Sequence, residues 1–296
     1  MTLKWFAKML FVTSVLSPVA AHAAPLKVVA SFSILGDIAQ EIGGDKITIT
    51  TLVGPNGDAH VYEPKPADAV AMTEANLVLV NGLGFEGFIE RLAKTSASSA
   101  QIITVSTGVT PLIGEGEDAG KNDPHAFQSI PNVRLYVKNI VAALCVADAA
   151  DCETFKTNAG AYDAKLAALD SDVRAAIASI PEAKRTIITS HDAFGYFGHE
   201  YGLKFLAPEG ISTDSEASAA GVAALVDQMK SSKASALFVE NISDPRLIKQ
   251  ISEETGIKIG GSLYSDALSA ADEPAATYID MMRSNVKVIK GAILGS

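Results

Sequence analysis

Three histidines and one aspartate occupy matching places in this sequence, because each follows an apolar stretch that is typical of a β-strand. His60, His125, His191 and Asp266 are separated by 65, 66 and 75 residues. Three neutral imidazoles and a carboxylate suit a borderline divalent metal ion, and tetrahedral zinc is the natural occupant of such a set. Binding through both oxygens of Asp266 would allow five-coordination and admit manganese. The chemistry indicated is therefore metal binding.

The sequence also allows a structural explanation for these residues. His125 could instead cap the helix that follows it. Asp266 could cap the turn after its strand, which would leave a site of three histidines completed by water. Glu240 ends the apolar stretch 236–239, and it is either a hydrogen-bond partner of a ligand histidine or an ordinary strand-end carboxylate. The residue types alone leave these alternatives open.

The chain alternates between strand-like and helix-like patterns. Short apolar or β-branched runs lie at 26–31, 47–53, 77–80, 101–105, 186–189, 236–239 and 257–264. Helical spacing of apolar residues is found at 34–42, 67–75, 85–94, 133–147, 217–230, 244–255 and 274–293. Strands alternating with helices of about ten residues predict an α/β fold with two lobes, each a mainly parallel sheet flanked by helices. Ligands of such sheets bind beyond the carboxyl ends of the strands.

One long helical stretch separates the two series. Residues 153–180 contain a single glycine, Gly160, and no proline before Pro181. About 27 helical residues would span roughly 40 Å and form a rigid connector. We therefore expect a first metal-binding lobe at 24–152, a connecting helix at 153–181 and a second metal-binding lobe at 182–296. The four candidate ligands would then meet in the cleft between the lobes.

The first 23 residues have the pattern of a secretory signal peptide. Lys4 and Lys8 precede an apolar run, and Ala21-His22-Ala23 fits a cleavage site. The run is too short for a membrane span, and no cysteine stands at the cleavage point to carry a lipid anchor. We expect a soluble periplasmic protein. In that oxidising compartment, Cys145 and Cys152 are expected to form a disulfide.

The charge balance argues against one class of partner. The chain has 24 basic and 34 acidic residues, a formal net charge of -10, and no basic stripe or arginine run. This composition predicts no nucleic-acid binding.

Four motifs around the candidate ligands resemble those of a known family. They are Gly54-Pro55 through His60 to Glu63-Pro64, Asp123-Pro124-His125, His191-Asp192-Ala193-Phe194-Gly195-Tyr196-Phe197 and Ser265-Asp266. In this order they are similar to the ligand motifs of the zinc/manganese solute-binding proteins of bacterial ABC importers, and the resemblance covers essentially the whole chain after residue 23. It implies two lobes bridged by one long helix. It also implies that His60 and His125 are first-lobe metal ligands and that His191 and Asp266 are second-lobe ligands.

The resemblance implies a function as well. Such a protein is a carrier that captures a divalent metal ion in the periplasm and hands it to an ABC importer permease. Members with glutamate in place of His191 tend to be manganese or iron proteins, so the histidine favours zinc, with a manganese or iron carrier as the alternative. Many zinc members carry a histidine-rich loop where this chain has the polar loop 108–123, which contains no histidine. We expect a monomer, with a periplasmic metallochaperone as a further candidate partner.

A zinc-dependent hydrolase is the alternative from a different class. Catalytic zinc keeps an open coordination position and usually has an acid or base nearby. Four protein ligands would close this site, and the sequence has no HExxH-like pair. We therefore expect a protein that is not an enzyme.

Overall fold

Two four-stranded parallel sheets form the two lobes of the molecule. The computed structural model describes residues 24–295 apart from 115, 216 and 233, so the expected signal peptide lies outside the described residues. The strand order is β2-β1-β3-β4 in the first sheet and β6-β5-β7-β8 in the second, and neighbouring strands run parallel. The strands are β1 (Leu26–Phe32), β2 (Ile47–Val53), β3 (Leu77–Val80), β4 (Gln101–Thr104), β5 (Thr186–Ile188), β6 (Lys204–Leu206), β7 (Leu237–Glu240) and β8 (Ile259–Leu263).

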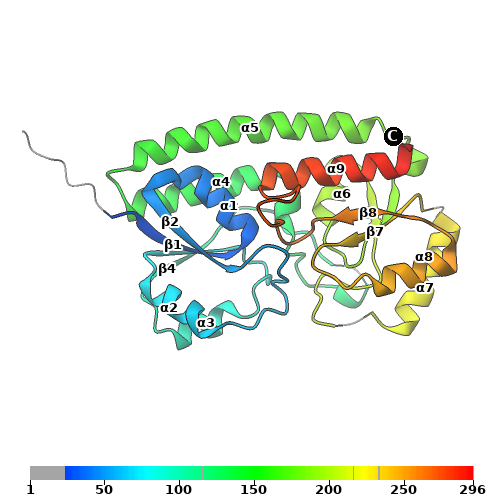
Figure 1. Cartoon of the computed structure of the whole chain (residues 1–296), viewed down its shortest axis with the longest axis horizontal. Helices are drawn as coiled ribbons and strands as arrows, with labels where there is room; N and C mark the ends of the chain where they lie inside the picture. The colour runs from blue at the N-terminus through cyan, green and yellow to red at the C-terminus, as the bar shows by residue number, and fades with distance from the viewer. Residues whose placement is uncertain (1–23, 115, 216, 233, 296) are drawn as a thin grey trace, which may run out of the picture.

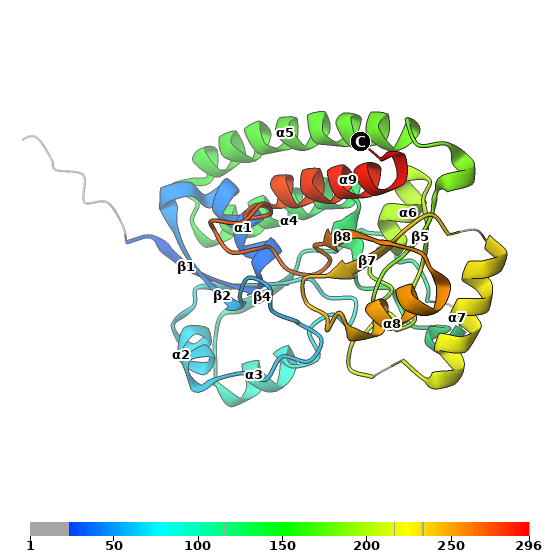
Figure 2. The same cartoon turned by 45° about the vertical axis from the view of Figure 1, so that its right-hand side comes forward.

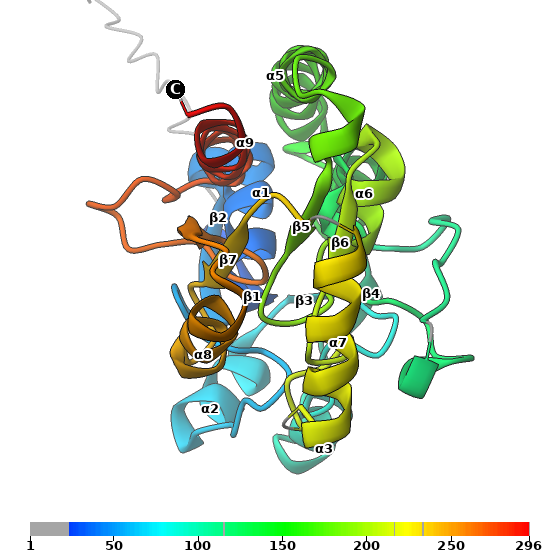
Figure 3. The same ribbon diagram turned by 90° about the vertical axis from the view of Figure 1, so that its right-hand side faces the viewer.

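Helices cover both faces of each sheet. In the first lobe, α1 and α4 lie on one side and α2 and α3 on the other (Figure 1). In the second lobe, α6 and α9 lie on one side, and α7 and α8 lie together on the other, where they share an apolar cluster with Ile188 and Leu237 (Figures 1 and 3). The helices are α1 (Ser33–Gly43), α2 (Pro66–Glu74), α3 (Ile89–Thr95), α4 (Ile130–Ala147), α5 (Cys152–Ala178), α6 (Gly195–Tyr201), α7 (Ala219–Ser232), α8 (Arg246–Thr255) and α9 (Tyr278–Leu294). The expected α/β class with a parallel sheet in each lobe is confirmed.

The 27-residue helix α5 runs along both lobes, and α9 lies beside it (Figures 1 and 2). Its buried residues recur at helical spacing on one side and include Phe155, Tyr162, Leu166, Leu169, Val173 and Ile177. One continuous apolar core contains β1, α5 and α9 side chains, from Val28 to Ile293. The lobes therefore share a core as well as a connector. The division at 24–152, 153–181 and 182–296 into separate units stays a prediction.

The helix α4 is long and apolar enough in composition to cross a membrane. It packs instead against α1 and α5, and Arg134 on it forms an ion pair with Asp163 of α5 at 2.6 Å. These contacts are those of a helix in a globular core. The disulfide between Cys145 and Cys152 is present and joins the end of α4 to the start of α5.

Some predicted elements differ from the structure at their ends. The edge strand β6 was not predicted, because its three residues are partly exposed and lack the buried apolar run that marks β5. The helix expected at 217–230 begins at Ala219, and Ser218 Oγ accepts a hydrogen bond from the Gly221 N–H at 3.0 Å. The last helix begins at Tyr278, four residues after Pro274, with Thr277 as its N-cap.

Candidate metal centre

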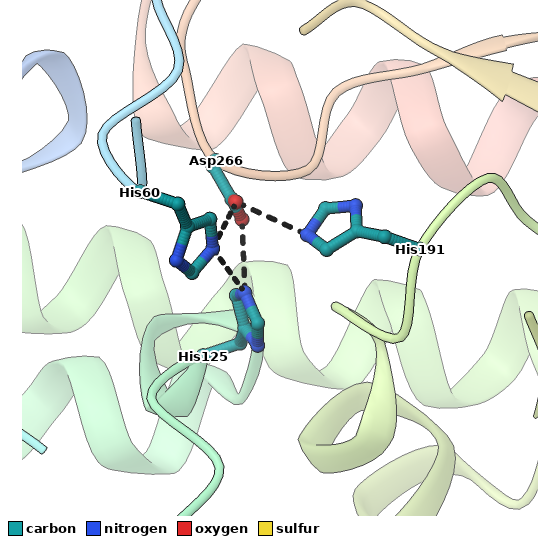
Figure 4. A group of neighbouring side chains, drawn as sticks. All are labelled: His60, His125, His191 and Asp266. Atoms are coloured by element: carbon teal, nitrogen blue, oxygen red, sulfur yellow. Dashed lines mark hydrogen bonds and ion pairs between the residues drawn. The ribbon is translucent and has the colours of Figure 1, made fainter. Parts of the chain in front are cut away.

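The four candidate side chains converge between the lobes, each from beyond the carboxyl end of a strand. His60 follows β2, His125 follows β4, His191 follows β5 and Asp266 follows β8. One donor atom from each lies within 4.8 Å of the others. Figure 4 shows the Asp266 carboxylate facing the three imidazoles. The structure therefore brings together every residue that the sequence indicated as a ligand.

The donor atoms surround a small space. Asp266 Oδ2 lies 3.2 Å from His60 Nε2 and 3.2 Å from His191 Nε2, and Asp266 Oδ1 lies 3.5 Å from His125 Nε2. The Nε2 atoms of His60 and His125 are 3.3 Å apart. The side chains of His125, His191 and Asp266 are fully buried, and that of His60 is 3% exposed. The set is thus enclosed, with His60 at its outer side.

Aspartates two residues upstream hold both first-lobe histidines. Asp123 Oδ1 accepts hydrogen bonds from the His125 backbone N–H at 2.9 Å and from Nδ1 at 2.8 Å. Asp58 Oδ1 accepts a hydrogen bond from the His60 backbone N–H at 2.9 Å. The ring of Phe85 packs edge-on against both imidazoles, with centroids 5.0 and 6.0 Å away. These contacts fix the first-lobe rings with Nε2 towards Asp266.

Glu240, the last residue of β7, supports His191 in the second lobe. Its Oε1 accepts a hydrogen bond from the His191 backbone N–H at 2.9 Å, and its Oε2 lies 2.6 Å from His191 Nδ1. Both side chains are fully buried. A carboxylate on the far nitrogen sets the imidazole tautomer and leaves Nε2 free for a metal ion.

Charge coupling dominates the electrostatics of the cluster. Burial opposes the charged form of His125, but the Asp266 and Asp123 carboxylates raise its pKa to about 9. Burial likewise opposes the charged form of His191, but Glu240 and Asp266 raise its pKa well above its usual value. Burial alone would raise the pKa of Asp266, yet the two imidazoles hold it well below its usual range. The pocket therefore favours positive charge beside an ionised carboxylate.

The Asp266 carboxylate shows directly what kind of occupant fits. Both of its oxygens are buried, and neither accepts a well-directed hydrogen bond from any residue in the described part of the chain. A buried carboxylate is costly unless it is paired or coordinates a metal. Three imidazole nitrogens and these oxygens fit a divalent cation, whose binding requires the imidazoles to be neutral.

Two asparagines that the sequence reasoning missed position the ligand loops. Asn81, directly after β3, donates from Nδ2 to the Pro124 carbonyl at 2.8 Å. Asn241, directly after β7, accepts from the Ser265 N–H at 3.3 Å and donates to the Ala267 carbonyl at 3.1 Å. The sequence feature that could have identified them is an asparagine directly after an inner strand in each lobe.

The polar loop 108–123 reaches the second lobe. Tyr196 of α6 donates from its hydroxyl to the Asp123 carbonyl at 3.0 Å and accepts from the Leu112 N–H at 3.0 Å. A short antiparallel bridge between Ile113 and Asn122 closes the loop. The loop thereby connects the segment before His125 to the second lobe.

The comparison with known proteins shows the family. Residues 28–292 match the family described as "Zinc-uptake complex component A periplasmic". The iron-binding protein YfeA of Yersinia pestis is 36% identical over 268 residues, which is 90% of this chain and 86% of that protein. The manganese-binding lipoprotein MntA of Halalkalibacterium halodurans is 35% identical over 261 residues, which is 88% of this chain and 86% of MntA.

Solved structures agree with this assignment. The periplasmic zinc-binding protein TroA of Treponema pallidum superposes with a TM-score of 0.86 at 29% identity, covering 92% of this chain and 99% of TroA. These proteins are named for iron, manganese and zinc, so the family gives a divalent metal without choosing one. MntA is named as a lipoprotein, so the family does not exclude a lipid anchor, and its expected absence here stays a prediction. The chain belongs to the zinc-uptake complex component A family, the metal-binding, non-enzymatic substrate-binding proteins of ABC transporters.

Proposed function

We propose that this protein binds zinc through His60, His125, His191 and Asp266 in the periplasm and delivers the ion to its ABC permease. The third imidazole carries the choice of metal. His191 Nε2 stands 3.2 Å from Asp266, where it adds a third nitrogen donor to the set. Imidazole suits zinc, whereas manganese prefers sites richer in oxygen. The relatives named for manganese and iron make those ions the competing candidates.

A competitive titration tests the choice of metal. Chelator-stripped protein is titrated with zinc and with manganese against a chelator of known affinity. We expect one equivalent of zinc to bind more tightly than manganese by at least about 100-fold, in line with the Irving–Williams order. Equal affinities for the two ions would show that the zinc assignment is wrong.

A substitution tests the site itself. His191→Ala should weaken zinc binding more than about 100-fold, because losing a ligand costs more than losing a ligand's hydrogen-bond partner. His199→Ala is the matched control, since His199 lies on α6 and is exposed. A His191→Ala protein that is folded and retains full zinc affinity would exclude the proposed ligand set.

The bound state would be signalled to the permease by a local change near the metal centre. Both α5 and α9 pack along the lobes, which supports a local change in place of wide lobe closure. Metal binding would order the second-lobe loops around His191 and Asp266, and the permease would recognise that ordered state. Small-angle scattering with and without zinc should give the same radius of gyration. A large compaction on binding would contradict this mechanism.

The remaining parts of the proposal concern the protein's surroundings. We propose that it acts as a monomer exported by residues 1–23, with no lipid anchor, and that it is loaded directly or by a metallochaperone. Sedimentation of the protein from the periplasmic fraction tests its size and its release without detergent. A dimer, or a detergent-dependent fraction, would contradict these points.

A further inference from the structure

A segment of the second lobe lies across the opening that leads to the candidate metal centre. A cleft of about 530 Å³ is lined by His60, Leu83 and Pro124 of the first lobe and by Ile211, Ser212 and Asp214 of the second. Of the four candidate ligands, His60 is the one that lines this cleft. An ion passing between solvent and the centre through this cleft must therefore pass residues 207–215, which follow β6.

Two first-lobe carboxylates hold the outer part of this segment. Thr213 donates from Oγ1 to Asp58 Oδ2 at 2.6 Å, and the Ile211 N–H donates to Asp118 Oδ2 at 2.9 Å. Ile211 is 6% exposed. A Cβ built on Gly210 would come within 2.2 Å of Asp118 Oδ2, so the glycine permits this close approach.

The inner part of the same segment runs beside His191. The Asp192 N–H donates to the Gly210 carbonyl at 3.1 Å, and the Glu209 N–H donates to the Ser190 carbonyl at 3.4 Å. These bonds flank His191 on both sides, and His191 forms a parallel bridge with Glu209. The segment thus joins a second-lobe ligand to the first lobe.

Asp58 links the segment to the other side of the site. While Oδ2 accepts from Thr213, its Oδ1 accepts from the His60 backbone N–H at 2.9 Å. One carboxylate therefore holds the His60 loop and the segment that covers it. Of the hydrogen-bonded residues Thr213 and Asp58, Thr213 can be substituted without removing the Asp58 hydrogen bond to the His60 backbone.

We propose that residues 207–215 form a gate over His60, closed by the Thr213–Asp58 and Ile211–Asp118 hydrogen bonds, and that opening this gate limits the entry and the release of the metal ion. This inference rests on the proposed metal-binding function and adds its kinetic control. No gate side chain belongs to the proposed ligand set. Opening the gate therefore lowers the barrier in both directions and leaves the binding equilibrium nearly unchanged.

Thr213→Val tests the gate, because it keeps the shape of the side chain and removes the hydroxyl donor. A hydrogen bond to a charged acceptor contributes about 1.5 kcal/mol at the lower end of the usual range, which corresponds to slightly more than tenfold in an equilibrium. Stopped-flow mixing measures zinc uptake by the stripped protein and zinc loss to excess chelator. We expect both rates to rise about tenfold, with the dissociation constant changed less than threefold.

Matched variants separate the gate from general damage. Thr213→Ser keeps the donor and should retain both wild-type rates. Thr157→Val makes the same substitution in α5, where the hydroxyl bonds the Glu153 carbonyl of its own helix at 2.8 Å, and should also change neither rate. Asp118→Ala removes the second bond of the gate, and it should accelerate both rates independently of Thr213.

The outcomes are distinct. Unchanged rates in folded Thr213→Val and Asp118→Ala proteins would overturn the gate. Faster release with unchanged uptake, and hence a larger dissociation constant, would also overturn it. The segment would then stabilise the bound metal ion by holding the ligands in place. If the wild-type protein bound neither zinc nor manganese, the proposed function would fail. That result differs from normal zinc binding with uptake and release rates that the gate substitutions do not change.

Discussion

Replacing Glu240 with glutamine tests whether a buried carboxylate sets the metal affinity of this site. The side chain of Glu240 is fully buried, its Oε1 accepts from the His191 N–H at 2.9 Å, and its Oε2 lies 2.6 Å from His191 Nδ1. Glutamine has the same size and can keep the first contact through its oxygen. Its NH₂ group would then face Nδ1 and could not accept a proton from it. The imidazole would lose the partner that orients the ring and raises its basicity.

The expected loss follows from this geometry. Removing such a partner from a metal-ligating histidine typically costs 10–100-fold in affinity. Because both side chains are fully buried, no water can replace the carboxylate at Nδ1. We therefore expect Glu240→Gln to weaken zinc binding about 100-fold, which is about 2.7 kcal/mol.

Two assays measure the effect. Competition with a chelator gives the dissociation constant. At a free zinc concentration well above both dissociation constants, the zinc-dependent gain in unfolding free energy should shrink by the same amount, about 2.7 kcal/mol. Glu200→Gln is the control, since Glu200 of α6 forms its ion pair with Arg174 away from the centre. If Glu240→Gln folds normally and its zinc affinity stays within threefold of wild type, the supporting role of Glu240 is refuted.

Two further predictions concern stability. Burial raises the pKa of Asp37 from 3.8 to about 6, although a hydrogen bond from the Tyr278 N–H opposes the shift. The folded-state pKa is the higher one, so ionisation destabilises the fold as the pH rises from about 4 to 6, by (6 − 3.8) × 1.36, or on the order of 3 kcal/mol. Asp37→Asn should therefore be more stable than wild type by up to that amount at pH 7 and equally stable near pH 4. Urea unfolding at both pH values measures the two free energies. The same stability difference at both pH values would contradict the prediction. Replacing Cys145 and Cys152 with serine should lower the unfolding free energy by about 2.5 kcal/mol, from the entropy of a short closed loop. An unchanged urea midpoint would show that the helix ends hold the loop without the disulfide.

The strands were predictable because their signals are local and strong. Runs such as Leu77–Val80, which is buried throughout, can be read directly as inner strands of a parallel sheet. The edge strand β6 could not be predicted because it is partly exposed and has no buried apolar run. The helix expected at 85–94 begins only at Ile89, because the Glu86 side chain holds the residues before it in a turn. Glu86 accepts hydrogen bonds there from the N–H groups of Asn81 and Gly82 at 2.6 and 3.1 Å.

The convergence of the four candidate side chains was predictable for a related reason. In a parallel sheet every strand ends at the same edge, so four polar residues after four strands have few places to meet. Their supporting contacts were less accessible. Asp58 looks like a residue of an ordinary polar turn, yet it bonds both His60 and Thr213. Such contacts depend on how the lobes face each other, which no local pattern encodes.

The repeated strand order explains how unlike sequences build one site. In the orders β2-β1-β3-β4 and β6-β5-β7-β8, β3 corresponds to β7 and β4 to β8. His125 follows β4 and Asp266 follows β8, so these two candidate ligands occupy equivalent places. Asn81 after β3 holds the carbonyl before His125, and Asn241 after β7 bonds the residues on both sides of Asp266. The same amide at the same place thus supports a nitrogen donor in one lobe and an oxygen donor in the other.

The loops after β2 and β6 are also equivalent, but they have different roles. The first carries His60, and the second is the segment 207–215 that lies over it. They meet where Thr213 bonds Asp58. Since equivalent loops of two facing lobes meet across the cleft, the site can open by separating these loops alone. The rigid pairing of α5 and α9 therefore does not stand in the way of metal exchange, because exchange through these loops requires no rotation of one lobe against the other.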